Sequence, residues 1–201
     1  MTVRSFALAI LASSIVALGG TTQALAQKKA PEGSSKILLL SGGQRQHHGY
    51  RDQALYLAGL LEDTGRHEVT INEDAAILES PGLARYDVLI VTADRRDPEF
   101  HFTEAQQRAI FDFVRSGKGY VSIHGADTGA KDWLPEWREL LGGVFSHDTS
   151  GGRPDGKVRK GTYPIKIADP SHAVTKGLSD FELQDELYYH IQMEPGVEPL
   201  A

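Results

Sequence analysis

Short apolar segments alternate with polar ones along most of the chain after residue 35. Residues 36–41 (KILLLS), 86–92 (YDVLIVT) and 119–123 (GYVSI) are continuous apolar runs, and residues 67–71 (HEVTI) alternate polar and apolar positions. A run that is apolar on every position predicts a strand covered on both faces, as in a parallel sheet. An alternating run also predicts a strand, with one face less covered. We therefore expect four strands in this region.

Two segments between these strands have helical periodicity. Residues 50–63 place their leucines near helical spacing, and Gly65 is a plausible end of the helix. Residues 103–116 have the clearest helical pattern, because Thr103 and Gln106 form a capping box and Gly117 follows the last turn. The leucines near helical spacing in the first helix are Leu55, Leu57, Leu60 and Leu61. In the second helix the stripe expected to be buried is Ile110, Phe113 and Val114.

The order strand, helix, strand, strand, helix, strand predicts an α/β fold. We expect a three-layer sandwich with a mainly parallel sheet flanked by helices. Ligands of such sheets bind beyond the carboxyl ends of the strands. Residues 42–50, 92–101 and 124–128 should therefore lie around one rim, together with a segment from the last third of the chain.

The last third is less regular. A short helix led by Pro135 is expected to contain Trp133 and Trp137, which either join the core or form a platform for a sugar ring. Residues 150–161 are polar and glycine-rich, which predicts a loop. Residues 163–167 and 186–193 are expected to be strands or extended segments.

The first 26 residues have the layout of a secretory signal peptide. Arg4 precedes an uncharged apolar run at residues 6–18, and Ala24-Leu25-Ala26 places small residues at the positions that a signal peptidase requires. The run is too short for a permanent membrane span, although a short N-terminal anchor is the alternative. We predict cleavage after Ala26 and a periplasmic or secreted protein. Residues 27–35 are then a flexible lead-in, and residues 36–201 form the domain.

Composition restricts the possible chemistry. The chain has 201 residues, of which 40% are hydrophobic and 24% charged, so a disordered polymer is excluded. Its formal charge of −6 does not favour a nucleic-acid partner, because phosphate binding needs clustered positive charge. The absence of cysteine excludes disulfides, a thiolate nucleophile and thiolate metal ligands. Any bound metal must therefore be held mainly by histidine and carboxylate groups.

The segment Ser122-Ile123-His124-Gly125-Ala126 predicts a sharp turn from a strand into a helix. Small residues lie two positions before and one and two positions after His124. Such turns expose a catalytic side chain, and larger neighbours would collide there. In hydrolases and amidotransferases the central residue is serine or cysteine, so an imidazole leaves general acid–base catalysis or metal binding. A purely structural histidine at a strand end is the alternative.

Four segments occur in an order that identifies a family resemblance. They are GYVSIHGA, W-x3-W-x2-L-x-G-G-x-F-x-H over residues 133–147, ADPSHAVTKGL over residues 168–178, and DELYY over residues 185–189. Together they resemble the ThuA-like, or trehalose-utilisation, family. The resemblance implies a class I glutamine-amidotransferase-like fold without its thiol nucleophile, a link to disaccharides and their keto derivatives, and a divalent metal. Members usually continue past the position of Ala201, so we expect an incomplete C-terminal part.

Histidines on the expected rim are candidate metal ligands. His48 follows the first strand, His147 follows the Gly142-Gly143 turn, and His124 occupies the turn described above. A histidine and carboxylate set with an open position suits Zn, Mn, Ni or Fe, which would polarise a sugar carbonyl. We favour His48 over His47, because it lies nearer to the following helix. The alternative is an uncharged, hydrogen-bonded polar pocket.

Acidic and aromatic residues complete the candidate site. Asp185 and Glu186 precede Leu187, Tyr188 and Tyr189, which suggests half-buried catalytic carboxylates rather than a solvated charge pair. Tyr188 is a candidate for stacking on or bonding to a sugar. Asp94 and Gly43 follow predicted strands and are candidate substrate-binding positions on the rim.

These residues favour an exported enzyme that acts on a small carbohydrate, most plausibly a keto-sugar or keto-disaccharide. A ketone acidifies the neighbouring C–H, so one base and one electrophile suffice for enolisation, isomerisation or elimination. His124 or Glu186 would be the base, and His48 and His147, with or without a metal, would stabilise the enolate oxygen. One alternative is a non-catalytic carbohydrate-binding module on the same scaffold. Another is a structural partner domain of a larger secreted complex.

Overall fold

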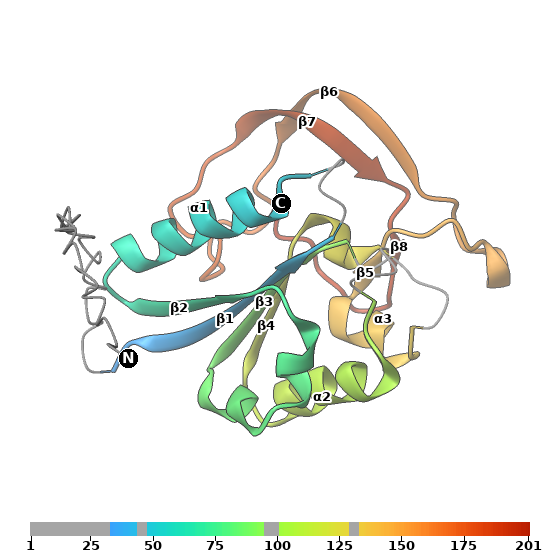
Figure 1. Cartoon of the computed structure of the whole chain (residues 1–201). Helices are drawn as coiled ribbons and strands as arrows, with labels where there is room; N and C mark the ends of the chain where they lie inside the picture. The colour runs from blue at the N-terminus through green and yellow to red at the C-terminus, as the bar shows by residue number, and fades with distance from the viewer. Residues whose placement is uncertain (1–32, 44–47, 95–100, 129–132) are drawn as a thin grey trace, which may run out of the picture.

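Four parallel strands form the centre of the molecule. The computed structural model describes residues 33–43, 48–94, 101–128 and 133–201, so the predicted signal peptide at residues 1–26 and most of the lead-in lie outside the described residues. The strands are β1 (Ser35–Gly42), β2 (His67–Asn72), β3 (Val88–Ala93) and β4 (Gly119–Ser122). They lie side by side in the order β2-β1-β3-β4, and every neighbouring pair is parallel (Figure 1). The predicted α/β fold with a parallel sheet is confirmed.

Both faces of the sheet are covered by apolar side chains, which explains the continuous apolar runs. Along β1, Ile37 and Leu39 pack into the cluster beneath helix α1 (Tyr50–Asp63), whereas Leu38 and Leu40 pack into the cluster on the opposite face. Successive side chains of a strand point to opposite faces, so a strand buried on both sides needs apolar residues at every position. The three-layer arrangement follows from this pattern (Figure 1).

Helix α1 packs on the sheet mainly through small residues. Its buried residues are Tyr50, Ala54 and Ala58, whereas Leu55 and Leu60 are 54% and 50% exposed. Leu57 and Leu61 are partly buried against the same cluster. Alanine side chains are small, so the helix backbone lies close to the sheet along this side, and helical geometry then directs Leu55 and Leu60 outward.

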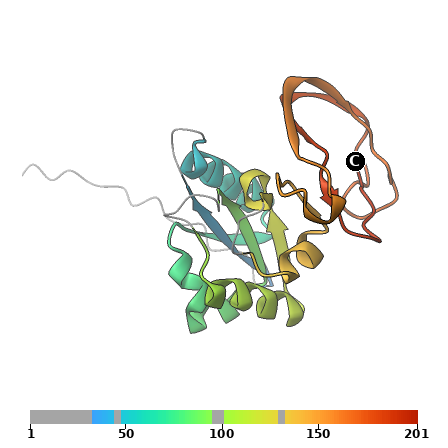
Figure 2. The same ribbon diagram turned by 90° about the vertical axis from the view of Figure 1, so that its right-hand side faces the viewer.

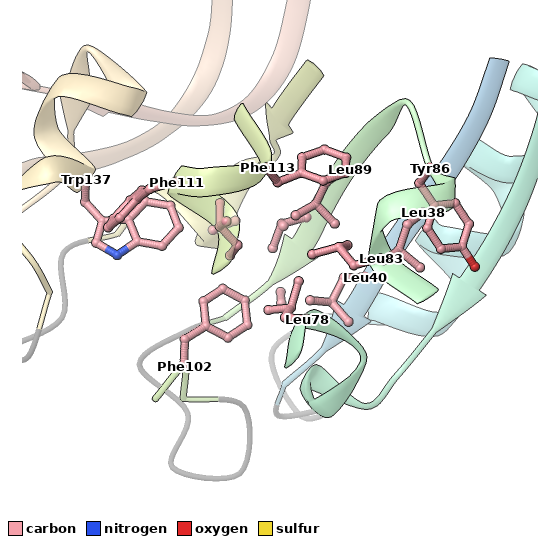
Figure 3. Close-up of a cluster of buried hydrophobic side chains, with 14 residues drawn as sticks. Leu38, Leu40, Leu78, Leu83, Tyr86, Leu89, Phe102, Phe111, Phe113 and Trp137 are labelled. Carbon is pink, nitrogen blue, oxygen red and sulfur yellow. The ribbon is translucent and has the colours of Figure 1, made fainter. Parts of the chain in front are cut away.

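Helix α2 (Glu104–Arg115) covers the other face and begins as predicted. The Gln106 N–H donates to Thr103 Oγ1 (3.2 Å), and the Thr103 N–H donates to Gln106 Oε1 (3.0 Å), which completes the capping box. Ile110 and Phe113 are buried in the core shown in Figure 3. Two short 3-10 helices, η1 (Ala75–Glu79) and η2 (Pro81–Arg85), supply further core side chains to this face.

Trp137 joins the same core from the short helix α3 (Glu136–Leu141). Its side chain is fully buried, and its indole Nε1–H donates to Gln107 Oε1 (2.6 Å), which also accepts from the Leu134 N–H (3.0 Å). Trp133 packs against the cluster and is partly buried. Of the two functions considered for Trp137, the structure therefore supports the core residue rather than the sugar platform (Figure 3).

A long hairpin dominates the last third of the chain. Strands β6 (Lys157–Ile165) and β7 (Phe181–Tyr189) pair antiparallel over their whole length, and β5 (Gly143–Val144) pairs with β8 (Gln192–Met193). Figure 2 shows the hairpin extending beside the central sheet. The predicted loop at residues 150–161 is therefore wrong over residues 157–161, which belong to β6. Their pairing with residues 185–189 is distant in sequence, so local polarity gave no sign of it.

No helix in the described part of the chain has both the length and the apolar character needed to cross a membrane.

Candidate functional site

Three predicted rim residues follow the carboxyl ends of neighbouring strands. Gly43 follows β1, Asp94 follows β3, and His124 lies two residues after β4. Strand β2 lies on one side of β1, and β3 lies on the other side. The direction in which successive strands are added to the sheet therefore reverses between β1 and β3. Ligands of open α/β sheets bind at the carboxyl ends of the strands at such a point. The Asp94 N–H donates to the Gly42 carbonyl oxygen (3.2 Å), which ties the two strand ends together. The rim forms where the sequence predicted it.

Gly43 allows these groups to approach one another. Its φ is +120°, and an added Cβ would lie 2.9 Å from Tyr50 Cε2 and 3.1 Å from the Asp94 backbone nitrogen. Both the backbone conformation and the space therefore require glycine at this position. Gly43 contributes to the site by shaping the turn between β1 and α1.

His124 occupies the tight turn that its small neighbours predicted. Its φ is +54°, a left-handed conformation that is uncommon outside glycine, and a short 3-10 helix η4 (His124–Asp127) begins at this residue. An added Cβ at Gly125 would lie 3.3 Å from the Tyr50 hydroxyl and 3.5 Å from the Ala93 carbonyl oxygen. A larger residue at position 125 would crowd both. Backbone conformations of this kind cost about 1–3 kcal/mol and are concentrated at functional sites.

His48 and His124 form a pair of facing imidazoles. Their Nε2 atoms are 3.0 Å apart, and the ring centroids are 4.5 Å apart with nearly perpendicular planes. A hydrogen bond between two imidazole nitrogens requires that one carries the hydrogen and the other a lone pair. The pair therefore holds an N–H group and the nitrogen that accepts it at the same place, and a substrate that replaced this contact would meet one donor and one basic nitrogen.

The environment keeps His124 in its neutral form. Partial burial of the ring lowers the pKa of His124 below its ordinary value of about 6.5, and the adjacent His48 lowers it further. The carboxylates of Glu186, Asp185 and Asp94 act in the opposite direction but have the smaller effect. A neutral imidazole at neutral pH can accept a proton or bind a metal.

The β6–β7 hairpin brings Glu186 and Tyr188 to the same site. The ring centroid of Tyr188 is 5.4 Å from that of His124, and the Tyr188 hydroxyl donates to Glu186 Oε2 (3.1 Å). Lys160 Nζ lies 3.0 Å from Glu186 Oε1. Lys160 first and Tyr188 second lower the pKa of the Glu186 carboxyl, which is therefore ionised at neutral pH.

Lys160 is a site residue that sequence reasoning missed. It lies directly opposite Glu186 in the antiparallel register of the hairpin. Directly opposed residues share one face of a two-stranded sheet, and opposite charges stabilise such a pair. Both charges are visible in the sequence. That Lys160 pairs with Glu186 can be inferred only once residues 157–161 are placed in a strand.

A pocket of about 750 Å³ joins these elements. His48 and His124 line it at the rim, and Lys160, Asp185 and Glu186 line it from the hairpin. Its volume falls within the range of about 300–1,000 Å³ that is typical of small-molecule sites. The structure therefore gathers His48, His124, Asp185 and Glu186, all of which were predicted, around one cavity.

His147 lies apart from this group. Its Nδ1 is 2.7 Å from Asp155 Oδ1, its ring contacts that of Phe145, and it does not line the pocket. Among the described residues, no three histidine, aspartate or glutamate side chains are gathered so that they could hold a metal ion. His47 lies outside the described residues. Of the three predicted metal ligands, the structure brings only His48 and His124 together.

A family model described as "Trehalose utilisation" matches residues 36–201. The chain belongs to the ThuA family. A crystal structure of a ThuA-like protein from Bacteroides uniformis superposes with a TM-score of 0.60 at 22% sequence identity. The match covers 80% of this chain and 62% of that chain, so this chain spans less than two thirds of the length of the other. A search of curated proteins gave no match.

The structural match establishes the ThuA fold, and the family model establishes membership. Neither assigns a reaction to the residues at the rim. In this ThuA chain the sharp turn after β4 carries an imidazole, so the reactive groups at the rim are the His48–His124 pair and the hairpin residues that line the same pocket.

Proposed function

We propose that this ThuA chain is an exported enzyme that removes a proton next to the ketone of a keto-sugar or keto-disaccharide. The observation that carries the proposal is the contact between His48 and His124 at a pocket of suitable size, with His124 held on a left-handed turn. The signal-peptide layout of residues 1–26 supports export. The family description supports a carbohydrate substrate.

The proposed step needs one base and one hydrogen-bond donor. A neutral imidazole nitrogen of His124 takes the proton from the carbon next to the carbonyl, and the C–H electron pair moves into the carbonyl to form an enolate. The His48 N–H stabilises the enolate oxygen. The enolate then either takes a proton on carbon from the His124 imidazolium, which gives exchange or isomerisation, or expels a glycosidic oxygen from the next carbon. In the second case the leaving oxygen takes the proton from the His124 imidazolium, which completes the elimination and restores the neutral base.

His124 is a better candidate for the base than Glu186. The Glu186 carboxylate is already bound by the Tyr188 hydroxyl and the Lys160 ammonium group, and its lowered pKa makes it a weaker base. Its negative charge favours protonation of His124, so Glu186 stabilises the imidazolium that forms when His124 takes the proton. We assign Glu186, and with it Asp185, an electrostatic function in the step.

Deuterium exchange tests this proposal directly. When full-length protein is incubated with a keto-disaccharide in D₂O, we expect deuterium to enter the carbon next to the ketone, or the glycosidic bond to break, at a rate well above that of the uncatalysed reaction. The parent disaccharide, which has no ketone, should remain unchanged in a parallel incubation. Both events can be followed by NMR. Stoichiometric binding of the keto-disaccharide with neither exchange nor cleavage would support the non-catalytic carbohydrate-binding module instead.

We also propose a divalent metal, Zn, Mn, Ni or Fe, bound at His48 and His124. The two facing Nε2 atoms supply two nitrogen donors, whereas catalytic metals commonly have three protein ligands, so the described residues fit a metal only in part. A metal there would act as a Lewis acid on the carbonyl oxygen. This metal-bound form is an alternative to the proton transfer described above, because a metal on His124 Nε2 would occupy the lone pair that takes the proton.

Elemental analysis of purified full-length protein tests the metal. We expect a near-stoichiometric metal that is lost in His48→Ala and retained in His147→Ala, because His147 is held by Asp155 away from the pair. Metal-free wild-type protein after purification without chelators contradicts the proposal, and so does loss of the metal from His147→Ala alone.

A further inference from the structure

One wall of the pocket takes no part in the proposed proton transfer. Gln53, Tyr56 and Leu57 line the pocket from α1, and Gln184 lines it from β7. Figures 1 and 2 show α1 and the hairpin on the same side of the molecule, away from α2. We call the part of the cavity that these residues line its outer end, and the part at the His48–His124 pair its inner end.

Tyr56 stands out on this wall. It is 71% exposed, although a tyrosine side chain carries a large apolar surface. Single exposed aromatic residues are ordinary on protein surfaces and need no explanation by themselves. Tyr56, however, lies on a pocket wall, where a ligand can cover the ring that the fold leaves open.

Helical geometry separates Tyr56 from the reacting end of the pocket. The ring of Tyr50, at the start of α1, is 5.5 Å from the ring of His48. Tyr56 lies six residues further on, which is about 9 Å along the helix axis. A sugar ring bound against the His48–His124 pair would therefore leave Tyr56 uncovered, and the pocket volume of about 750 Å³ leaves room for a second ring.

The side chains at the outer end suit a second sugar ring. The face of an aromatic ring carries partial negative charge, which attracts the weakly positive C–H groups on one face of a pyranose. The amides of Gln53 and Gln184 each offer donors and an acceptor for hydroxyl groups. The ammonium group among the described lining residues, that of Lys160, is paired with Glu186, so this wall favours a neutral sugar over an anionic one.

We propose that Tyr56 is the stacking platform of an outer subsite that holds the non-reacting ring of a two-ring carbohydrate. Gln53 and Gln184 bond the hydroxyl groups of that ring. The assignment rests on the proposed function, because it takes a carbohydrate to be the ligand of the pocket. The subsite deepens that proposal by naming the residues that would make the protein bind a disaccharide more tightly than a single sugar.

Calorimetric titration of full-length protein with trehalose and with glucose tests the subsite without any need for turnover. We expect wild-type protein to bind trehalose more tightly than glucose. Tyr56→Ala should weaken trehalose binding about tenfold and leave glucose binding within about twofold, whereas Tyr56→Phe keeps the ring face and should bind as wild type does. Leu55→Ala is the matched control, since Leu55 is a comparably exposed α1 side chain that does not line the pocket.

The outcomes separate the subsite from the proposed function. Unchanged trehalose binding by Tyr56→Ala overturns the stacking platform, and so does an equal loss of affinity for both sugars. If wild-type protein exchanges deuterium into a keto-disaccharide but Tyr56→Ala binds trehalose normally, the proposed function stands and the subsite fails. If wild-type protein binds neither sugar, the subsite is overturned, whereas the deuterium-exchange experiment with a keto-disaccharide decides the proposed function separately. Tyr56 is exposed, so an unchanged thermal midpoint should show that the variant is folded.

Discussion

Replacing His124 with asparagine is expected to lower the rate of deuterium exchange or cleavage of a keto-disaccharide by about 10²–10⁴-fold, the usual contribution of a general base. The variant loses the basic nitrogen that faces His48. Asparagine tolerates the left-handed conformation that His124 adopts, so the turn after β4 should keep its shape. The loss would therefore report on chemistry and not on folding.

The pH dependence of the rate provides a second test of whether His124 is the base. The base must be neutral to accept a proton, so the wild-type rate should fall as the pH decreases through the pKa of His124, which lies below the ordinary value of about 6.5. Burial of the ring is the main cause of that lowered pKa. The residual activity of His124→Asn should lack this acidic limb.

The matched control is His172→Asn, which removes an imidazole from an exposed loop. His172 Nδ1 accepts a hydrogen bond from the Val174 N–H (3.2 Å), and the residue does not line the pocket. We expect this variant to keep nearly the full rate. Undiminished turnover by His124→Asn would show that His124 is not the base, and an equal loss in both variants would point to a general effect on the protein.

The largest expected effect on stability comes from Trp137. Replacing it with alanine should lower the free energy of unfolding by about 3–5 kcal/mol, as is usual for a buried tryptophan. The indole is fully buried and contacts the rings of Phe111 (5.0 Å between centroids), Tyr120 (6.0 Å) and Trp133 (5.4 Å). Because whole domains are stable by only about 5–15 kcal/mol, this change removes a large share of the total.

Two further variants separate the contributions to this loss. Trp137→Phe keeps an aromatic ring in the core but removes the N–H that donates to Gln107 Oε1, so we expect a smaller loss of about 1–2 kcal/mol. Trp133→Ala should cost less than Trp137→Ala, since Trp133 is only partly buried. Urea denaturation followed by circular dichroism measures all three. Equal stability of Trp137→Ala and wild type would contradict the placement of Trp137 in the core.

Local features of the sequence were sufficient for the central layers of the fold. The strand at residues 36–41 is continuous and apolar because both of its faces are buried, and that pattern is visible without the structure. The start of α2 depends on two hydrogen bonds between Thr103 and Gln106, which are three residues apart. The turn at His124 could be recognised for a similar reason, because steric exclusion acts on its immediate neighbours.

The site itself depends on contacts that no local pattern encodes. His48 and His124 are 76 residues apart in the chain, and they meet because the first and last strands of the parallel sheet end at the same rim. Lys160 reaches Glu186 only through the register of the hairpin. His147 follows a glycine turn as predicted, yet it pairs with Asp155 outside the pocket.

The sequence by itself therefore determined the strands of the central sheet, the two helices that flank it and the chemical groups available, since each of these follows from burial periodicity and neighbouring residues. Only the tertiary structure decided which histidines meet, which side of α1 faces the sheet and which hairpin residues close the pocket. Those outcomes depend on how separately formed elements pack, where small differences in helix rotation or strand register move a side chain from one face to another.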